Sequence, residues 1–539
     1  MNSKKTALWL PVLVILTLII GIVIGNYFSS RPVGGKLFLS TGNKIDVVLN
    51  TIYKNYVDSV DMHSLVEGAI PKIVSELDPH SVYISAADLQ AVNEDLEGHF
   101  SGIGVQFIIQ NDTIMVVSII PDGPSEKLGL QPGDRIVTIN DSLFVGPTIT
   151  NEKVMKNLRG PKGTVVTVGI KRVNNKELEE YKITRGDIPI NTVDVAYQIK
   201  PGIGFIKINK FGRTTYNEFI VSISKLLSEG CDSFIIDLRG NSGGYLDAAI
   251  NIVNEFLPRG RLIVYTEGRA FPRNDSFANG TGTCQNEPLI ILTDELSASA
   301  SEIVAGAIQD NDRGTIIGRR TFGKGLVQNQ FPLSDNSALR LTVARYYTPS
   351  GRSIQKKYEL GKGDEYDKDL EIRYIHGEFD TVDSIKQGNN PQYQTRLGRI
   401  VFGGGGIMPD IFVPRDTTGT SSYYTNLINR GILYEFALQY ADQHRNLKDK
   451  YEDYKSLLAH LQTQPLLEEV VNFAESKGIR RRPTLIEISK NQIENITRAY
   501  IIKNFFREEG FYPVILMPDP AVNKAIEVIQ KGKAFPVKQ

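Results

Sequence analysis

The sequence predicts a multidomain α+β protein, with a helical N-terminal segment, a β-rich module, an α/β core and a helical C-terminal extension in that order. Three observations indicate this fold class. The chain has 539 residues, more than one hydrophobic core usually serves. Apolar residues recur at a helical period towards both ends and at a strand period between them. In the central part, short β-branched runs alternate with helical segments, which is typical of a sheet covered on both faces.

The first feature along the chain is an apolar stretch at residues 7–25, which has no charged side chain and follows Lys4 and Lys5. As a helix it would span about 28 Å at roughly 1.5 Å per residue, close to the roughly 30 Å hydrocarbon core of a bilayer. We therefore expect a cytoplasmic tail and transmembrane anchor within residues 1–30, with the rest of the chain outside the cytosol. A cleaved signal peptide is the alternative, although no clear A-x-A-like site follows.

Residues 36–98 are predicted to form the helical N-terminal domain. Apolar residues recur there at three- and four-residue steps in two stretches, 43–57 and 64–77, as on one face of a helix. The polar turn that begins at Leu77 leads to an extended piece.

Residues 99–185 have a different rhythm and are predicted to form a compact β-rich module. Residues 104–121 read as two strands around a turn, and residues 123–141 as a short helix, a turn and a strand. Residues 165–185 read as a closing hairpin.

Residues 187–415 are predicted to form the α/β core. Short β-branched runs at 204–211, 233–240, 261–268 and 288–295 alternate with the helical periodicity of 215–230 and 246–257. Within this core, residues 356–399 are polar and charged and indicate an insertion. A linker-like stretch follows at 416–422, and residues 423–539 have the helical spacing of a C-terminal extension.

Composition excludes some functions. Lysine plus arginine and aspartate plus glutamate both number 61, so no charge imbalance suggests a nucleic-acid partner. The 6 histidines are scattered, and we expect no metal site. The two cysteines, Cys231 and Cys284, have no metal or redox spacing. They could form one disulfide outside the cytosol, or remain as two unpaired, partly buried thiols.

The strongest chemical signal is a cluster of serines between a predicted strand and a predicted helix. Ser297, Ser299 and Ser301 lie between the run 288–295 and the helical segment that follows. A helix N-terminus offers free amides and a favourable dipole to negative charge, as an acyl-transfer site requires. The alternative is that these serines only cap the helix, and Ser301 fits that role. Periodicity does not choose between Ser297 and Ser299.

No histidine is placed convincingly as a base for such a serine, but Lys324 follows in a glycine-rich segment. A lysine can serve as base when burial removes its proton. Keeping it neutral at pH 7 costs about 4.6 kcal/mol, at roughly 1.36 per pKa unit, so desolvation or a nearby positive charge is needed. An exposed loop lysine is the alternative, whereas a GxxxxGK[ST] phosphate loop is absent. Gln328 could orient the amine by accepting a hydrogen bond, or could simply be solvated.

A second glycine-rich turn, residues 237–244, begins within the predicted strand run 233–240 and continues beyond it. Its successive amides could supply an oxyanion donor. A tight connection that requires positive φ angles is the alternative.

Together these motifs resemble the carboxyl-terminal processing peptidases, or tail-specific proteases, of the serine–lysine class. The resemblance covers roughly residues 40–415. Its matching elements are residues 77–81, 101–105, 129–134, 158–164, 237–244, 297–307, 321–328 and 404–414.

The resemblance implies roles for particular residues. Ser299, the middle serine, would be the nucleophile, Lys324 the base and Gln328 its partner. The Ala300 amide would form the oxyanion hole with an amide of one of the two glycines, Gly243 or Gly244. The core would be an α/β peptidase core of the crotonase-like type.

The same resemblance implies that the β-rich module is a PDZ domain. Its loop would bind a substrate's terminal carboxylate through the residues Ser101, Gly102, Ile103, Gly104 and Val105. The substrate tail would add as a strand beside the segment that follows. Arg159 would connect the module to the active site, with a simple salt bridge as the alternative role.

The expected function is that of a serine endopeptidase that recognises the flexible C-terminal tails of extracytoplasmic proteins. We expect it in the bacterial cytoplasmic membrane with a single span and its catalytic domain facing the periplasm. No cofactor, metal or nucleic acid is expected, and the C-terminal helices could serve a homo-oligomer or an adaptor. One alternative is a non-catalytic PDZ scaffold that binds C-terminal peptides, and another is an acyl-CoA enzyme built on the same core.

Overall fold

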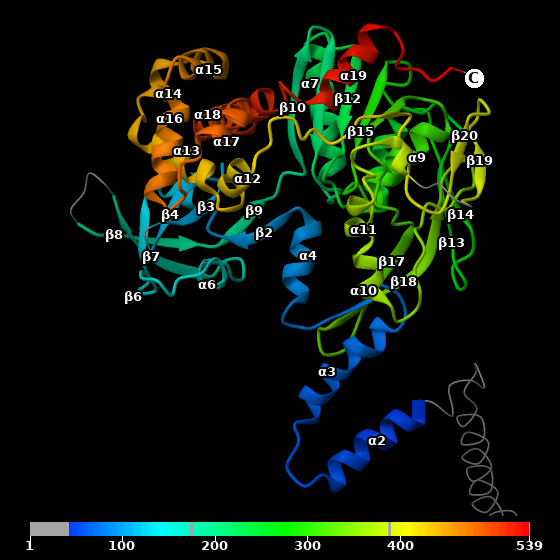
Figure 1. Cartoon of the computed structure of the whole chain (residues 1–539). Helices are drawn as coiled ribbons and strands as arrows, with labels where there is room; N and C mark the ends of the chain where they lie inside the picture. Colours follow the sequence, from blue (N-terminus) through cyan, green and yellow to red (C-terminus); the bar gives the residue numbers. More distant parts are fainter. Residues whose placement is uncertain (1–41, 111, 122, 173–176, 386–389, 538–539) are drawn as a thin grey trace, which may run out of the picture. The chain divides into compact units, whose positions relative to one another are not determined.

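The computed structural model describes residues 42–110, 112–121, 123–172, 177–385 and 390–537 (Figure 1). The chain divides into two units, residues 1–73 and 74–539. The first contains the helix α2 (Gly42–Asn55) and most of α3 (Met62–Ser75). All further elements belong to the second unit.

The predicted membrane location needs correction. In the part of the chain that the structure describes, no helix is long and apolar enough to cross a membrane. The location in the cytoplasmic membrane, with a single span and a periplasmic catalytic domain, is therefore wrong on this finding. The predicted anchor at residues 7–25 lies outside the described residues.

The β-rich module is an antiparallel sheet with strand order β3-β4-β5-β7-β8, and β6 also pairs with β5. Buried aliphatic side chains such as Ile114, Val116 and Val166 form its own core. Because β3 pairs only with β4 among the described strands, one edge of the sheet is open there. The elements are β3 (Val105–Gln110), β4 (Thr113–Ile119), α5 (Pro124–Lys127), β5 (Arg135–Ile139), β6 (Ser142–Leu143), α6 (Asn151–Leu158), β7 (Val165–Lys171) and β8 (Glu179–Thr184).

A two-stranded ribbon joins this module to the core. The strand that enters the module, β2 (His99–Gly102), pairs antiparallel with the strand that leaves it, β9 (Gly186–Pro189). The short strand β1 (Val82–Ile84) and the helix α4 (Leu89–Glu97) precede β2.

The core contains a six-stranded sheet, β10-β11-β12-β15-β16-β21, which is parallel except for the antiparallel pair of β10 and β11. Side chains of β11, β12 and β15 alternate between two apolar clusters, so both faces are buried, as the β-branched runs predict. The strands are β10 (Val193–Lys200), β11 (Ile203–Ile208), β12 (Ser233–Asp237), β15 (Leu289–Thr293), β16 (Thr315–Gly318) and β21 (Ile411–Phe412).

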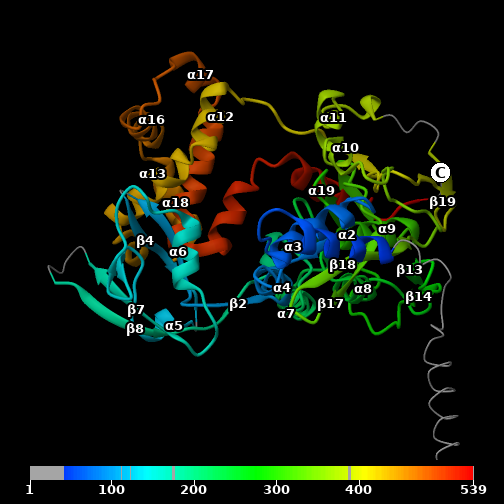
Figure 2. The same cartoon turned by 90° about the horizontal axis from the view of Figure 1, so that it is seen from below.

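Different helices cover the two faces of this sheet. The helices α7 (Thr215–Ser228), α8 (Leu246–Asn254) and α9 (Ala300–Asp310) contribute to one cluster. The helix α19 (Pro520–Gln530), near the end of the described chain, contributes to the other (Figure 2).

A second, antiparallel sheet has the order β1-β18-β13-β14, and β17 also pairs with β18. Its strands are β13 (Leu262–Glu267), β14 (Asn274–Phe277), β17 (Leu326–Pro332) and β18 (Ala338–Tyr347). The predicted insertion, residues 356–399, contains the short elements α10 (Gly363–Asp367), α11 (Asp369–Ile375), η1 (Val382–Ser384) and β19 (Gln392–Gln394). β19 pairs with the next strand, β20 (Ile400–Phe402).

The C-terminal extension has two parts. Its larger part forms a helical bundle with a separate apolar core. The bundle helices are α12 (Ser422–Asn429), α13 (Ile432–Gln443), α14 (Leu447–Lys450), α15 (Tyr454–Gln462), α16 (Leu466–Ser476), α17 (Pro483–Ile488) and α18 (Lys490–Ile515). The backbone of α18 leaves helical geometry at Arg507, with φ 51° and ψ −146°. After α18, α19 packs on the core sheet instead.

The two cysteines are both buried and unpaired. The disulfide alternative is therefore excluded, and burial raises the pKa of both thiols.

Candidate active site

The serine turn, defined here as residues 294–301, connects the end of β15 to the start of α9. Ser299 is the residue before the helix and has φ 55° and ψ −112°. This conformation is rare for a residue with a Cβ atom and persists only where surrounding contacts impose it. Strained backbone at a strand-to-helix turn is a common way to present a nucleophile. Ala300 follows as the first helical residue.

The structure separates the three serines that the pattern leaves equivalent. Ser297 is fully buried, and its hydroxyl donates to the Leu238 carbonyl at 2.8 Å. Ser301 is also fully buried and donates to the Asn241 carbonyl at 2.9 Å. Ser301 is therefore not the helix cap as predicted, because the helix begins one residue before it and Ser299 holds the cap position. Of the three, only Ser299 is partly exposed.

The glycine turn, residues 237–244, lies directly against Ser299. A Cβ atom on Gly243 would come within 2.7 Å of the Cβ of Ser299, and one on Gly244 within 2.0 Å of the Phe211 carbonyl oxygen. Only glycine permits so close an approach. The Gly243 amide donates to Oδ1 of Asn241 at 2.9 Å, so this donor is already engaged.

The lysine loop, residues 321–325, meets the serine turn at Glu302. The carboxylate of Glu302 is fully buried, and its Oε2 accepts from the amides of both Ser299 (2.9 Å) and Lys324 (2.8 Å). Its Oε1 accepts from the Thr321 hydroxyl (2.5 Å) and the Gly323 amide (2.7 Å). The amides of Ser299 and Lys324 therefore converge on one oxygen atom.

A tyrosine adds a second connection between the two segments. The hydroxyl of Tyr346, on β18, contacts the carbonyl oxygens of both Ser299 (3.0 Å) and Lys324. Sequence reasoning assigned no role to Glu302 or Tyr346. For Glu302 a signal exists, because Ser299 and Glu302 have the S-x-x-E spacing of a capping box. No local pattern marks Tyr346.

The electrostatics of the site oppose charge on its titratable groups. Burial raises the pKa of Glu302 to about 7, although four hydrogen-bond donors favour its ionised form. Burial also lowers the pKa of the Lys324 amine, and the Arg340 guanidinium lowers it further, against the carboxylates of Glu302 and Asp78. Within the described residues, no carboxylate forms an ion pair with Lys324. These are the conditions that a lysine base requires.

Gln328 lies on β17, and its side chain points into a short polar chain. Its Nε2 donates to the Thr342 hydroxyl at 3.2 Å, and that hydroxyl donates to Asp78 at 2.9 Å. Asp78 also accepts from the Ser81 hydroxyl at 2.5 Å. The motif at residues 77–81 thus supports the strand pair that carries Gln328.

The predicted carboxylate-binding loop, residues 101–105, leads into β3, the strand at the open edge of the β-rich module. Ser101 and Gly102 end β2, and Val105 begins β3. The Ile103 carbonyl accepts from the hydroxyl of Ser125 at 2.6 Å, which holds the loop in place. The Ser101 hydroxyl is buried and has no hydrogen-bond partner within the described residues.

Arg159 lies at the C-terminal end of α6. Its guanidinium lies 4.3 Å from the centre of the Phe100 ring and 3.9 Å from the Glu94 carboxylate. It therefore connects the β-rich module to α4 and β2. No contact of its side chain with the serine turn or the lysine loop is present among the described residues.

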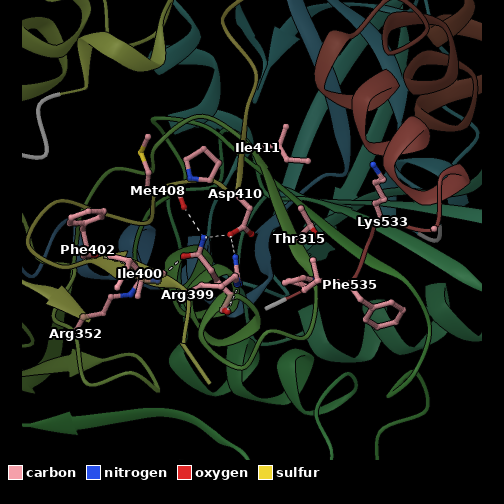
Figure 3. A pocket seen from close by; sticks show the side chains of 16 residues that line it. Thr315, Arg352, Arg399, Ile400, Phe402, Met408, Asp410, Ile411, Lys533 and Phe535 are labelled. Carbon is pink, nitrogen blue, oxygen red and sulfur yellow. Dashed lines mark hydrogen bonds and ion pairs between the residues drawn. The ribbon is translucent and has the colours of Figure 1, made fainter. Parts of the chain in front are cut away.

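A cavity of about 670 Å³ lies near the C-terminal end of α9, whereas Ser299 precedes the N-terminal end of this helix (Figure 3). Its polar walls are internally paired, because Arg399 lies 2.6 Å from Asp410 and the Thr315 hydroxyl donates to the Ala534 carbonyl at 2.8 Å. None of the predicted catalytic or carboxylate-binding residues lines it.

The fold and the site define a peptidase with an α/β core and a separate peptide-binding module. Comparison with known families agrees. Residues 202–366 match peptidase family S41, and residues 101–184 match the PDZ domain. Residues 31–87 match the N-terminal domain of the activating protease CtpB, and residues 423–507 match a family of unknown function, DUF8443.

Three curated relatives extend the match. The chain is 40% identical over 315 residues to a carboxy-terminal-processing protease of Bartonella bacilliformis, covering 57% of this chain and 71% of that one. It is 36% identical over 366 residues to a probable CtpA-like serine protease of Staphylococcus epidermidis, covering 66% and 73%. It is 34% identical over 318 residues to the carboxy-terminal processing protease CtpB of Bacillus subtilis, covering 58% and 66%. The chain belongs to the carboxy-terminal processing proteases of peptidase family S41 and is a serine-type endopeptidase.

Proposed function

We propose that this chain binds the free C-terminal tail of a protein substrate in its PDZ domain and cleaves the polypeptide upstream with a serine–lysine site. Ser299 is the nucleophile, Lys324 the base and Gln328 the residue that orients the lysine amine. The observation that carries this assignment is the shared carboxylate of Glu302, whose Oε2 accepts from the Ser299 and Lys324 amides at 2.9 and 2.8 Å.

The reaction then proceeds in two steps, acylation of Ser299 and hydrolysis of the resulting ester. The neutral Lys324 amine accepts the hydroxyl proton as the Ser299 oxygen bonds to the scissile carbonyl carbon. The resulting ammonium gives this proton to the leaving amine as the peptide bond breaks, which leaves an acyl group on Ser299. A water molecule, deprotonated by the same lysine, hydrolyses the ester and restores both groups.

The oxyanion that forms in each step needs amide donors. Ala300 and Gly244 are proposed for this role, because the third candidate, the Gly243 amide, donates to Asn241 at 2.9 Å. The Ala300 amide lies at the start of α9, where no earlier helical carbonyl can accept it. The helix dipole favours negative charge at this position as well.

Gln328 is suited to orient the lysine. Its Nε2 donates to Thr342 at 3.2 Å, and this fixes the side-chain amide while its Oε1 remains an acceptor. A lysine amine that donates to this oxygen would keep its lone pair free for the Ser299 proton.

The substrate tail would pair with the open edge of β3 and place its terminal carboxylate in the loop Ser101–Val105. The buried Ser101 hydroxyl, which lacks a partner among the described residues, is a candidate donor to that carboxylate. Arg159, between the Phe100 ring and Glu94, would convey occupancy of the loop towards the core.

We also propose a domain division at residues 36–98, 99–185, 187–415 with its insertion at 356–399, and 423–539. The exposed apolar residues Ile428 and Ile488 on the helical bundle support a role for the bundle in contacting an adaptor or a second copy of the chain.

The test is cleavage of a flexible-tailed protein substrate by the Ser299→Ala variant. We expect no cleavage, while binding of a tail peptide with a free carboxylate persists and an amidated peptide binds more weakly. The matched control is Ser276→Ala, a partly exposed serine on β14, which should leave both properties intact. Cleavage at the wild-type rate by Ser299→Ala would refute the assignment, and loss of cleavage without loss of binding excludes a non-catalytic scaffold.

A further inference from the structure

The inserted segment, residues 356–399, contacts the lysine loop directly. Arg373 on α11 is buried, and its guanidinium donates to the carbonyl oxygens of Thr321 (3.1 Å) and Arg320 (2.8 Å). The charge of Arg373 is balanced by Glu378 at 3.1 Å, which also pairs with Arg320 at 2.5 Å. The start of the lysine loop is therefore tied to the insertion by a buried ionic network.

Tyr366 on α10 closes the same side of the loop with its ring. The ring is buried and lies edge-on to Phe322, the second residue of the lysine loop, with 5.9 Å between ring centres. It also lies edge-on to His80 at 5.0 Å, and its hydroxyl bonds to Nε2 of His80 at 2.9 Å. One tyrosine thus joins the loop to the motif at residues 77–81.

Lys356 is the third residue that contacts this side of the lysine loop. Its ammonium lies 3.9 Å from the ring centres of both Phe322 and Tyr366 and 3.1 Å from the carboxylate of Asp369. Its backbone amide donates to the Gly323 carbonyl at 2.9 Å. Cation–π contacts of this kind hold a charged group without requiring water beside it.

The lysine loop is consequently held from two sides. The Glu302 carboxylate of the core accepts hydrogen bonds from the Thr321 hydroxyl and from the amides of Gly323 and Lys324. The insertion donates to the Thr321 carbonyl through Arg373 and packs on the Phe322 ring through Tyr366. Lys356 and Tyr366 lie at the end of the stretch 202–366 that matches peptidase family S41, whereas Arg373 lies beyond it.

We propose that Tyr366 and Arg373 are positioning residues for Lys324, which close the lysine loop opposite Glu302 and keep water away from the lysine amine. This inference rests on the proposed function of Lys324 as the base. Water at the amine would stabilise the ammonium form and so remove the base at neutral pH.

The other charged and titratable groups near Lys324 act on its pKa through their charges and do not exclude water from its amine. Arg340 on β18 disfavours a charge on Lys324, whereas Glu302 on α9 and Asp78 favour it. Burial, with the nearby Lys324 and Lys356, lowers the pKa of His80 to about 4, so His80 is neutral at working pH. Burial lowers the pKa of Lys356, whereas the Asp369 carboxylate, 3.1 Å away, favours its charged form.

The test is the pH dependence of kcat/KM for Tyr366→Ala. We expect the acid limb to move to higher pH, with a loss of about tenfold at neutral pH for roughly each unit of movement, and recovery as the pH rises. KM for the substrate tail should change less than kcat. The matched control is Tyr374→Ala, an aromatic residue of α11 that is 51% exposed and contacts Phe379 and Arg415 instead.

A second variant covers the case in which Tyr366→Ala does not fold. Arg373→Lys keeps the charge but cannot reach both carbonyls in a planar fork, so it should move the acid limb in the same direction by a smaller amount. An unchanged acid limb in the folded variants, or an equal loss of activity at every pH, would overturn the proposal. Neither result would affect the Ser299→Ala outcome, so the proposed function is tested independently.

Discussion

The serine turn and the lysine loop meet at Glu302, but different parts of the chain hold them. The serine turn is fixed by the neighbouring glycine turn, since the Ala298 amide and the Ser301 hydroxyl both donate to the Asn241 carbonyl, at 3.0 and 2.9 Å. The lysine loop depends on residues that come later, such as Gln355, which accepts from the Gly325 amide at 2.8 Å. The proposed nucleophile is thus held by motifs within the core, whereas the loop of the proposed base also contacts Arg373 of the insertion.

The largest effect should come from the serine side. Gly243→Ala would place a Cβ atom 2.7 Å from the Cβ of Ser299 and 2.8 Å from the Ala298 carbonyl oxygen, so the turn must move. We expect kcat to fall by at least about a hundredfold, comparable to the loss of an oxyanion donor. Steady-state cleavage kinetics would measure this loss.

The control for this prediction is Gly240→Ala in the same turn. Gly240 also has a positive φ, of 71°, but a Cβ atom there would meet nothing within 4 Å. It should lose about 1 kcal/mol of stability with kcat nearly unchanged. Equal kinetic losses for both variants would mean that backbone strain, not contact with Ser299, explains the result.

A smaller effect should come from Arg340 on the lysine side. The positive charge of Arg340 lowers the pKa of Lys324, so Arg340→Gln should raise that pKa. Less neutral lysine is then present at pH 7, and the acid limb of kcat/KM should move to higher pH, with a loss of several-fold at neutral pH. Arg345→Gln, an exposed residue on the same strand, is the control. An acid limb that moves to lower pH in Arg340→Gln would contradict this electrostatic account.

Sequence patterns predicted the parts of the site that local geometry determines. The strand-to-helix position of Ser299 and the glycine-rich surroundings of Gly243 and Lys324 follow from short motifs. The choice of Ser299 over Ser297 came from the family resemblance, and in the structure Ser297 and Ser301 are fully buried. The predicted roles of Ser299, Lys324 and Gln328 stay predictions until the variants are measured.

The contacts that the sequence did not predict are long-range. Helical periodicity identifies an amphipathic helix but not its partner, so it could not show that α19 packs on the core sheet. Polar composition marked residues 356–399 as a surface insertion, yet Tyr366 and Arg373 are buried against the lysine loop. The membrane location was inferred from residues 7–25 alone and is not supported by any helix in the described part of the chain.

The most direct test of the central claim is the single-turnover cleavage rate of wild type and Lys324→Ala between about pH 5 and pH 10. If neutral Lys324 takes the Ser299 proton, the wild-type rate should rise with pH through one ionisation below the ordinary lysine pKa, because burial lowers that pKa. Lys324→Ala should lose both the rate and this ionisation. A Lys324→Ala rate within about threefold of wild type, or a wild-type rate that is flat across this range, would contradict the account.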